Sequence, residues 1–331
     1  MRNDLLERIG RGPILCDGAM KTQLVELAFR RNLIPDRELS FSTGLWNVEQ
    51  PDVVEAVHRA YLEAGSELIL TNTFKASSFH VLKLGTTERL EDAARESVRW
   101  IEAATRLARK ACGDRAWVLG DIGHIISHMP EELRGDRDAL REECRQQAQT
   151  MYDAGADAII VEYMADPQEL AMAVEVAKEV SNRPVFATAV FGGEGSGEDR
   201  TYRTHRTDRT SEVAGASVDE VVKAAVDGGA DVVGAHCGVP LDLADYLALA
   251  RQIVASPCRP SHVPVIIQPN GSEKGKHLSG HDARPRTQAL AEAVPQFLDC
   301  GVQVLGGCCG TDPGDIRAMS CAMMRQGRNG G

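Results

Sequence analysis

The strongest constraint on the fold is a pattern that repeats along the whole chain. A short apolar run rich in β-branched residues is followed by a longer stretch with helical periodicity. The runs expected to form strands are residues 13–20, 67–74, 116–123, 158–164, 184–191, 231–237, 264–270 and 302–309. The helical stretches are residues 52–64, 88–111, 132–154, 167–180, 218–227, 241–254, 287–298 and 313–324. Eight such βα units predict a (β/α)8 TIM barrel.

No linker or change of composition divides the chain, so we expect a single barrel domain over residues 1–325. Residues 326–331 are rich in glycine and are expected to form a disordered tail. A doubly wound open sheet is the alternative fold, because the number of strands does not by itself show that a sheet closes.

Three segments are longer than the repeat requires, namely residues 30–50, 192–216 and 270–285. Each follows the C-terminal end of an expected strand, which is the catalytic face of a barrel. In residues 192–216, arginines alternate with acidic residues. This pattern is consistent with a lid that clamps a substrate carboxylate and also with a solvated loop of mixed charge.

Composition and charge exclude several kinds of partner. The 331 residues include 37 basic and 48 acidic side chains, a net charge of −11 that would repel nucleic acid and anionic membranes. No run approaches the roughly 20 apolar residues of a membrane span, and the N-terminus does not read as a signal peptide. We therefore expect a cytoplasmic protein with small-molecule partners.

Three of the nine cysteines stand at expected strand ends. Cys237 ends the sixth strand, and Cys308 and Cys309 end the eighth between glycines. Three thiolates and one open position are typical of a catalytic zinc site, provided that the backbone turns between the adjacent pair. The alternative is a buried core thiol and an unrelated tight turn. The other six cysteines are expected to be apolar fillers: Cys16, Cys112, Cys144, Cys258, Cys300 and Cys321.

Four motifs occur together: Asp-Gly-Ala-Met at 17–20, Thr-Asn-Thr-Phe at 71–74, Gly-Ala-His-Cys at 234–237 and Gly-Gly-Cys-Cys-Gly-Thr at 306–311. In this combination the chain resembles the homocysteine S-methyltransferase family, over nearly its whole length. The resemblance implies a (β/α)8 barrel with zinc on Cys237, Cys308 and Cys309. It also implies transfer of a methyl group to the thiol of homocysteine, forming methionine.

The resemblance further implies which residues contact homocysteine. Glu162, at the end of the fourth strand, would pair with the amine, and Asp17, Gly18 and Thr71 would supply the remaining contacts. From the residues alone, other roles stay open. Asp17 could cap the following helix, Glu162 could be a solvated carboxylate, and Thr71 could be an ordinary strand residue.

Aromatic residues near the site indicate which methyl donor is used, because a quaternary onium group is recognised by aromatic faces. Tyr163 and Trp46 resemble the aromatic positions of the betaine-dependent enzymes, so a betaine-like donor is the first expectation. Lys75 departs from that pattern, since those enzymes have a tyrosine there. S-methylmethionine or another sulfonium is the second expectation, and a zinc-thiol subunit of a multiprotein demethylase is the third. A homo-oligomer is left open.

One further departure lies beside the zinc motif. His236 stands where the family usually has asparagine. It could orient a zinc ligand from outside the coordination sphere, or it could be a plain substitution with the same hydrogen-bonding role.

Overall fold

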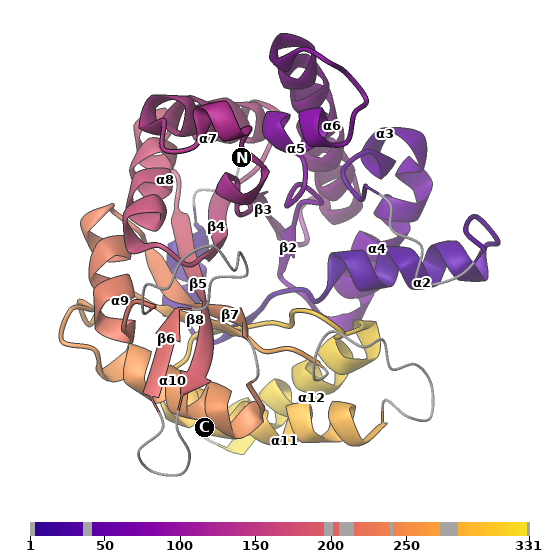
Figure 1. The fold of residues 1–331 in the computed structure, drawn as a ribbon. Helices are drawn as coiled ribbons and strands as arrows, with labels where there is room; N and C mark the ends of the chain where they lie inside the picture. Colours follow the sequence, from indigo (N-terminus) through magenta and orange to yellow (C-terminus); the bar gives the residue numbers. More distant parts are fainter. Residues whose placement is uncertain are drawn as a thin grey trace.

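The computed structural model describes residues 4–35, 42–194, 201–204, 215–238, 241–271 and 284–329. Its core is a barrel of parallel strands with helices in a ring around them (Figure 1). The parallel strands are β1 (Ile14–Leu15), β2 (Leu68–Leu70), β3 (Trp117–Ile122), β4 (Ala158–Met164), β5 (Val185–Glu194), β7 (Val232–Gly238), β8 (Val265–Gln268) and β9 (Val304–Leu305).

The sheet closes between its first two strands. β1 pairs with β9 on one side, with Ile14 opposite Val304. On the other side, Cys16 forms a parallel bridge with Leu68 of β2, and the Glu67 amide donates to the Leu15 carbonyl at 2.7 Å. An open doubly wound sheet would have two free edges here. The expected barrel is therefore confirmed, and the open sheet is excluded.

The barrel helices follow the expected periodicity, with ends that differ by a few residues. They are α4 (Pro51–Ala64), α6 (Leu90–Cys112), α7 (Arg137–Asp153), α8 (Pro167–Val180), α9 (Val218–Asp227), α10 (Leu243–Ala255), α11 (Arg284–Asp299) and α12 (Pro313–Asn329). α12 continues into residues 326–329, which were expected to be disordered. No helix in the described part of the chain is long and apolar enough to cross a membrane.

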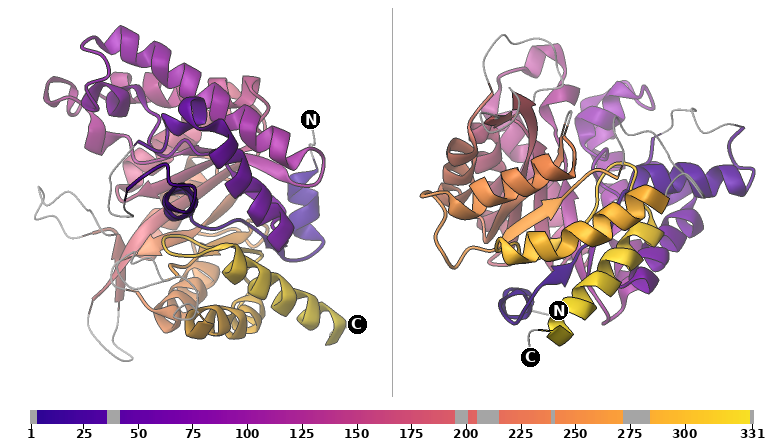
Figure 2. Two further views of the ribbon diagram at one scale, coloured as in Figure 1. Left: turned by 90° about the vertical axis from the view of Figure 1, so that its right-hand side faces the viewer. Right: turned by 90° about the horizontal axis from the view of Figure 1, so that it is seen from below.

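Further elements lie outside the eight βα units, and of these only a helix after Asp17 was considered in the sequence. They are the helices α1 (Leu5–Gly10), α2 (Met20–Arg30), α3 (Trp46–Glu49) and α5 (Ser78–Lys83), the 3-10 turns η1 (Ile126–His128) and η2 (Glu131–Leu133), and the strand β6 (Thr201–Thr204). β6 pairs antiparallel with the end of β5, so the 192–216 insertion contains a hairpin. Figure 2 shows this hairpin projecting beyond the parallel strands.

Alternation along each strand divides the apolar side chains into two layers. In β4, Ala158 and Ile160 belong to a cluster inside the barrel, whereas Ile159 and Val161 pack against the surrounding helices. Leu5 and Ile9 of α1 join the inner cluster, so α1 covers one end of the barrel; it lies behind the strands in Figure 1.

The same alternation predicts which side chains face inward at the opposite end, where the strands finish. Positions in register with the inner cluster carry polar groups there. They are Asp121, Glu162, Thr188, His236 and Gln268. This polar layer at the C-terminal mouth forms the floor of the candidate site.

Candidate active site

The three strand-end thiols meet at the mouth of the barrel. Cys237, Cys308 and Cys309 lie with their sulfur atoms within 4.8 Å of one another, and Cys237 Sγ is 4.0 Å from Cys309 Sγ. Sulfur atoms at the corners of a zinc tetrahedron are about 3.8 Å apart, given a zinc–sulfur bond of about 2.3 Å. A small contraction of this cluster would therefore accommodate the ion.

A tight turn brings the two adjacent cysteines to the same side. The amide of Thr311 donates to the Cys308 carbonyl at 3.0 Å, and the Thr311 hydroxyl donates to the same oxygen at 2.7 Å. Gly310 supports the turn with a φ of 82°, in the left-handed region. A Cβ atom on Gly307 would come within 2.4 Å of the Thr311 hydroxyl. Glycines on both sides of the pair thus allow the turn that zinc binding requires.

Cys237 reaches the cluster through an unusual backbone conformation. Its φ is 50°, and Tyr163 at the end of β4 has a φ of 63°. Such values are uncommon for residues with a Cβ, cost free energy and occur preferentially at functional sites. Cys237 follows His236 at the end of β7, so the left-handed turn moves its side chain out of the strand alternation and toward the mouth.

The charges of the three thiols fit a divalent cation. Hydrogen bonds from the Cys237 and Cys308 thiols lower the pKa of Cys309 to about 3. Hydrogen bonds with Cys237 and Cys309 raise the pKa of Cys308, because neighbouring sulfur atoms cannot all carry charge. A cation at the centre would remove this conflict and allow all three to ionise, and thiolate is a ligand that zinc prefers. In the described residues this is the one group of histidine, cysteine or acidic side chains with metal-binding geometry.

Carboxyl groups gather beneath the thiols. Burial raises the pKa of Asp17 to about 7, although the Leu70 amide donates to its Oδ2 at 3.0 Å. Burial raises the pKa of Glu162 as well, with further contributions from Cys237 and Asp17. Asp121 has a raised pKa for the same reason, together with the charges of Glu162 and Asp17. Carboxyl groups in this position favour a cationic ligand such as an ammonium group.

Asp121 was missed in the sequence although its signal was present. Its Oδ1 is buried and has no hydrogen-bond partner among the described atoms. In β3 it follows Trp117 and Leu119 in strict alternation, and both of these face the inside of the barrel. The same counting that places Glu162 at the mouth therefore predicts Asp121 there too.

Two other expected substrate residues have clear structural partners. Gly18 lies against the thiol loop, where a Cβ would come within 2.7 Å of the Thr311 hydroxyl. The Thr71 hydroxyl is 2.7 Å from that of Thr73 and accepts from the Asp121 amide at 3.0 Å. Asp17 does not cap α2, which begins at Met20 with no side-chain cap.

Of the two aromatic residues expected at the donor site, Tyr163 lies near the thiols, but its aromatic neighbour is Phe74 and not Trp46. Tyr163 packs against the small cluster that contains Cys237, as Cys308 also does, and its ring meets Phe74 edge-on at a centroid distance of 5.8 Å. Trp46 instead belongs to the main core between barrel and helices and is 8% exposed. The structure therefore brings Phe74 to Tyr163, because the chain leaves β2 directly toward the mouth.

His236 is part of the polar layer. Its Nδ1 lies 2.9 Å from the Thr188 hydroxyl, and its ring is 5.7 Å from that of Tyr163. Burial lowers its pKa to about 4, so the ring is neutral near pH 7. These contacts fit a residue that supports Tyr163 and the start of the thiol segment.

The arginine-rich hairpin is described only in part. Arg203 donates to the Gly215 carbonyl at 2.9 Å, and the Tyr202 hydroxyl donates to Asp245 at 3.1 Å. The other arginines on which the lid hypothesis depends lie outside the described residues.

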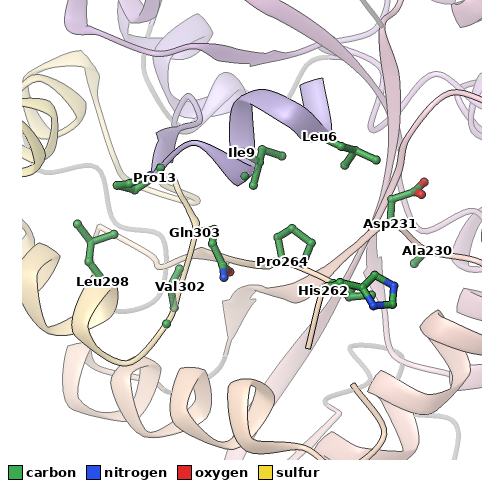
Figure 3. Close-up of a pocket in the computed structure, with 14 residues that line it drawn as sticks. Leu6, Ile9, Pro13, Ala230, Asp231, His262, Pro264, Leu298, Val302 and Gln303 are labelled. Carbon is green, nitrogen blue, oxygen red and sulfur yellow. The ribbon is translucent and has the colours of Figure 1, made fainter. Parts of the chain in front are cut away.

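A cavity of about 490 Å³ lies at the opposite end of the barrel. It is lined by α1 and by residues that precede the strands, including Leu6, Pro13, Pro264 and Val302 (Figure 3). None of its lining residues belongs to the thiol, carboxyl or aromatic groups described above. The chemistry therefore lies at the mouth and not in this cavity.

The chain is similar to known proteins over nearly its whole length. A family model described as homocysteine S-methyltransferase matches residues 14–323. Over 97% of its length the chain is 28% identical to a methionine synthase of Mycobacterium leprae, and it spans only 25% of that protein. Over 96% of its length it is 27% identical to an S-methylmethionine–homocysteine S-methyltransferase of Pongo abelii, covering 81% of that protein.

Among solved structures, the metallated form of the homocysteine methyltransferase MmuM from Escherichia coli has a similar fold. The TM-score is 0.66 at 22% identity, covering 97% of this chain and 99% of that one. At this identity the likeness supports the barrel fold alone.

Proposed function

Because the chain belongs to the homocysteine S-methyltransferase family, we propose that it transfers a methyl group from a small onium donor to the thiol of homocysteine, forming methionine. The observation that carries this proposal is the convergence of Cys237, Cys308 and Cys309 above a floor of buried carboxyl groups. The three thiols suit a metal that binds thiolates, and the carboxyl groups suit the ammonium group of an amino acid.

The acceptor must react as a thiolate, whereas a free thiol with a pKa near 8.5 is mostly protonated at neutral pH. Zinc on the three cysteines would supply the Lewis acidity that keeps the homocysteine sulfur deprotonated. Three thiolate ligands would leave the site with a formal charge of −1, so the acceptor sulfur would stay electron-rich.

The protein's own residues orient the acceptor. Glu162 and Asp17, with Asp121 beside them, form an acidic floor that would hold the ammonium group below the thiols. Their raised pKa values reflect burial without a cation, and a bound ammonium would lower them again. Thr71 and Gly18 keep β2 and the thiol loop in place around this floor.

A betaine-like donor is the leading proposal because Tyr163, whose ring meets that of Phe74 edge-on, packs against the cluster that contains Cys237. Aromatic rings attract an onium group that has no hydrogen to donate. S-methylmethionine is the second candidate, supported by the relative from Pongo abelii that is named for that donor.

The test is a donor screen with zinc-loaded protein and homocysteine, with methionine as the readout. Glycine betaine, dimethylsulfoniopropionate and S-methylmethionine are compared at equal concentration. We expect methionine from one of these onium donors. If none yields methionine and the protein does not bind homocysteine, the proposal is wrong, and a demethylase subunit acting on another thiol becomes the better hypothesis.

A further inference from the structure

Cys16 lies directly before Asp17, where the chain leaves β1 for the mouth of the barrel. The sequence suggested an apolar filler at this position, and the residue is indeed fully buried in the cluster inside the barrel. Its sulfur atom, however, is within hydrogen-bonding range of two polar side chains. These contacts indicate a role that a filler does not need.

The two contacts place Cys16 between a donor and an acceptor. Its thiol donates to Asp17 Oδ1 at 3.5 Å, and the side-chain amide of Gln268 donates to its sulfur at 3.9 Å. A thiol is both a weak donor and a weak acceptor, so it can make both bonds at once. Cys16 therefore connects the end of β8 with the carboxyl group of Asp17.

The glycines before the two adjacent zinc-site cysteines make this arrangement possible. A Cβ atom on Gly306 would come within 2.9 Å of Cys16 Cβ and 3.1 Å of Gln268 Cγ. Glycine thus leaves the space in which the two side chains meet. The amide of Gly307 donates to the Asp17 carbonyl at 2.9 Å. The segment that leads to the thiols therefore packs against both Cys16 and Asp17.

Both carboxyl oxygens of Asp17 accept hydrogen bonds from the protein. Oδ2 accepts from the Leu70 amide at 3.0 Å, and Oδ1 accepts from the Cys16 thiol. Burial raises the pKa of Asp17 to about 7, and these two bonds act against that shift. Burial also raises the pKa of Cys16, so its thiol keeps the proton that it donates. The two donors hold the carboxyl group in one orientation and favour its charged form.

We infer that Cys16 is a positioning residue, whose thiol holds the Asp17 carboxylate in place for the ammonium group of the acceptor. Cys16 acts through Asp17 and is not itself a catalytic residue. The inference rests on the proposed function, because it needs an acceptor whose ammonium group pairs with Asp17.

Two substitutions at Cys16 separate a positioning role from the filling of space. Serine keeps a hydrogen to donate, whereas alanine is apolar and has no donor. If Cys16 were only a filler, alanine would be the better replacement, because burying a hydroxyl in an apolar site costs free energy. If its thiol positions Asp17, serine is the better replacement.

Calorimetric titration of zinc-loaded protein with homocysteine measures the effect. We expect Cys16→Ala to raise the dissociation constant about fivefold or more, and Cys16→Ser to stay within about twofold of the wild type. The control Cys144→Ala, at a buried cysteine on α7, should bind homocysteine as the wild type does.

A second ligand shows whether the effect depends on the ammonium group. 4-Sulfanylbutanoate is homocysteine without its amino group, so it should bind equally to the wild type and to Cys16→Ala. This comparison needs only the alanine variant and therefore holds even if Cys16→Ser does not fold.

The inference is overturned if Cys16→Ser folds and binds homocysteine no better than Cys16→Ala, which would make Cys16 a filler. It is also overturned if Cys16→Ala keeps the wild-type affinity, or if it loses affinity for both ligands equally, since the latter defect would lie at the zinc site. In these cases the wild type still binds homocysteine and the proposed function stands. A wild type that does not bind homocysteine would refute the proposed function, and this inference with it.

Discussion

Arg286 at the start of α11 donates from Nη1 to the carbonyl oxygen of Gly310 at 2.8 Å, directly after the two adjacent thiols. The same guanidinium contacts Asp312 at 3.0 Å and Asp315 at 2.6 Å, and its side chain is only 8% exposed. This arginine therefore fixes the turn that brings Cys308 and Cys309 to one side.

We predict that Arg286→Lys weakens zinc binding about tenfold or more, because an ammonium cannot reproduce the planar set of donors. Competition with a chelator of known affinity measures the effect. Arg317→Lys, at an exposed position on α12, is the matched control and should keep the wild-type zinc affinity. Equal affinities in the two variants would show that Arg286 does not position the thiols.

The zinc ligands themselves can be tested by metal content. Cys308→Ser should abolish stoichiometric zinc, because serine is a poor substitute for a thiolate ligand. Cys258→Ser, at a cysteine outside the cluster, should retain one zinc per chain after the same loading and dialysis. Equal zinc content in both proteins would refute the ligand assignment.

The acidic floor predicts a defect in acceptor binding. Glu162→Ala should weaken homocysteine binding by more than about tenfold, or 1.4 kcal/mol, because the ammonium group loses a buried partner. Calorimetry with zinc-loaded protein measures the dissociation constant. Glu175→Ala on the outer face of α8 should leave it unchanged. An unchanged constant in the Glu162 variant would argue against the amine contact.

A buried histidine outside the site predicts a pH effect on stability. His58 on α4 is fully buried with no partner for either ring nitrogen among the described atoms, and burial lowers its pKa from 6.5 to about 4. Below pH 6.5 the unfolded chain takes up a proton that the folded chain resists. Stability is therefore lost as the pH falls from 6.5 toward 4.

We expect the wild type to lose about 2 kcal/mol more of its unfolding free energy than His58→Leu between pH 7.5 and 5. Urea denaturation of zinc-loaded protein at the two pH values measures this difference. His262→Leu, at an exposed position, serves as control and should follow the wild type. If all three proteins lose the same free energy, His58 does not carry the predicted linkage.

Most of the architecture could be predicted because it depends on periodicity. The helical stretches predicted α8 and α9 with their observed ends, and the apolar run at 158–164 became β4. β2 and β9 are shorter than expected, because side-chain and loop hydrogen bonds replace the ladder near the mouth. For example, the amide of Leu70 at the end of β2 donates to the Asp17 carboxylate at 3.0 Å.

The sequence predicted those site residues that a motif places at the end of a strand. It did not predict contacts between loops that follow different strands. The positions of Cys237, Cys308 and Cys309 followed from strand ends, and their proximity is confirmed. The pairing of Tyr163 with Phe74, and the contact between His80 and His128, depend on how loops after different strands pack. Sequence alone does not specify those distances.

The proposed function requires that the three cysteines hold zinc with one position left for the acceptor sulfur. X-ray absorption at the zinc edge measures this directly in zinc-loaded protein before and after homocysteine is added. We expect three sulfur ligands and one lighter atom before addition, and four sulfur ligands after it. A coordination sphere that homocysteine leaves unchanged would contradict this expectation.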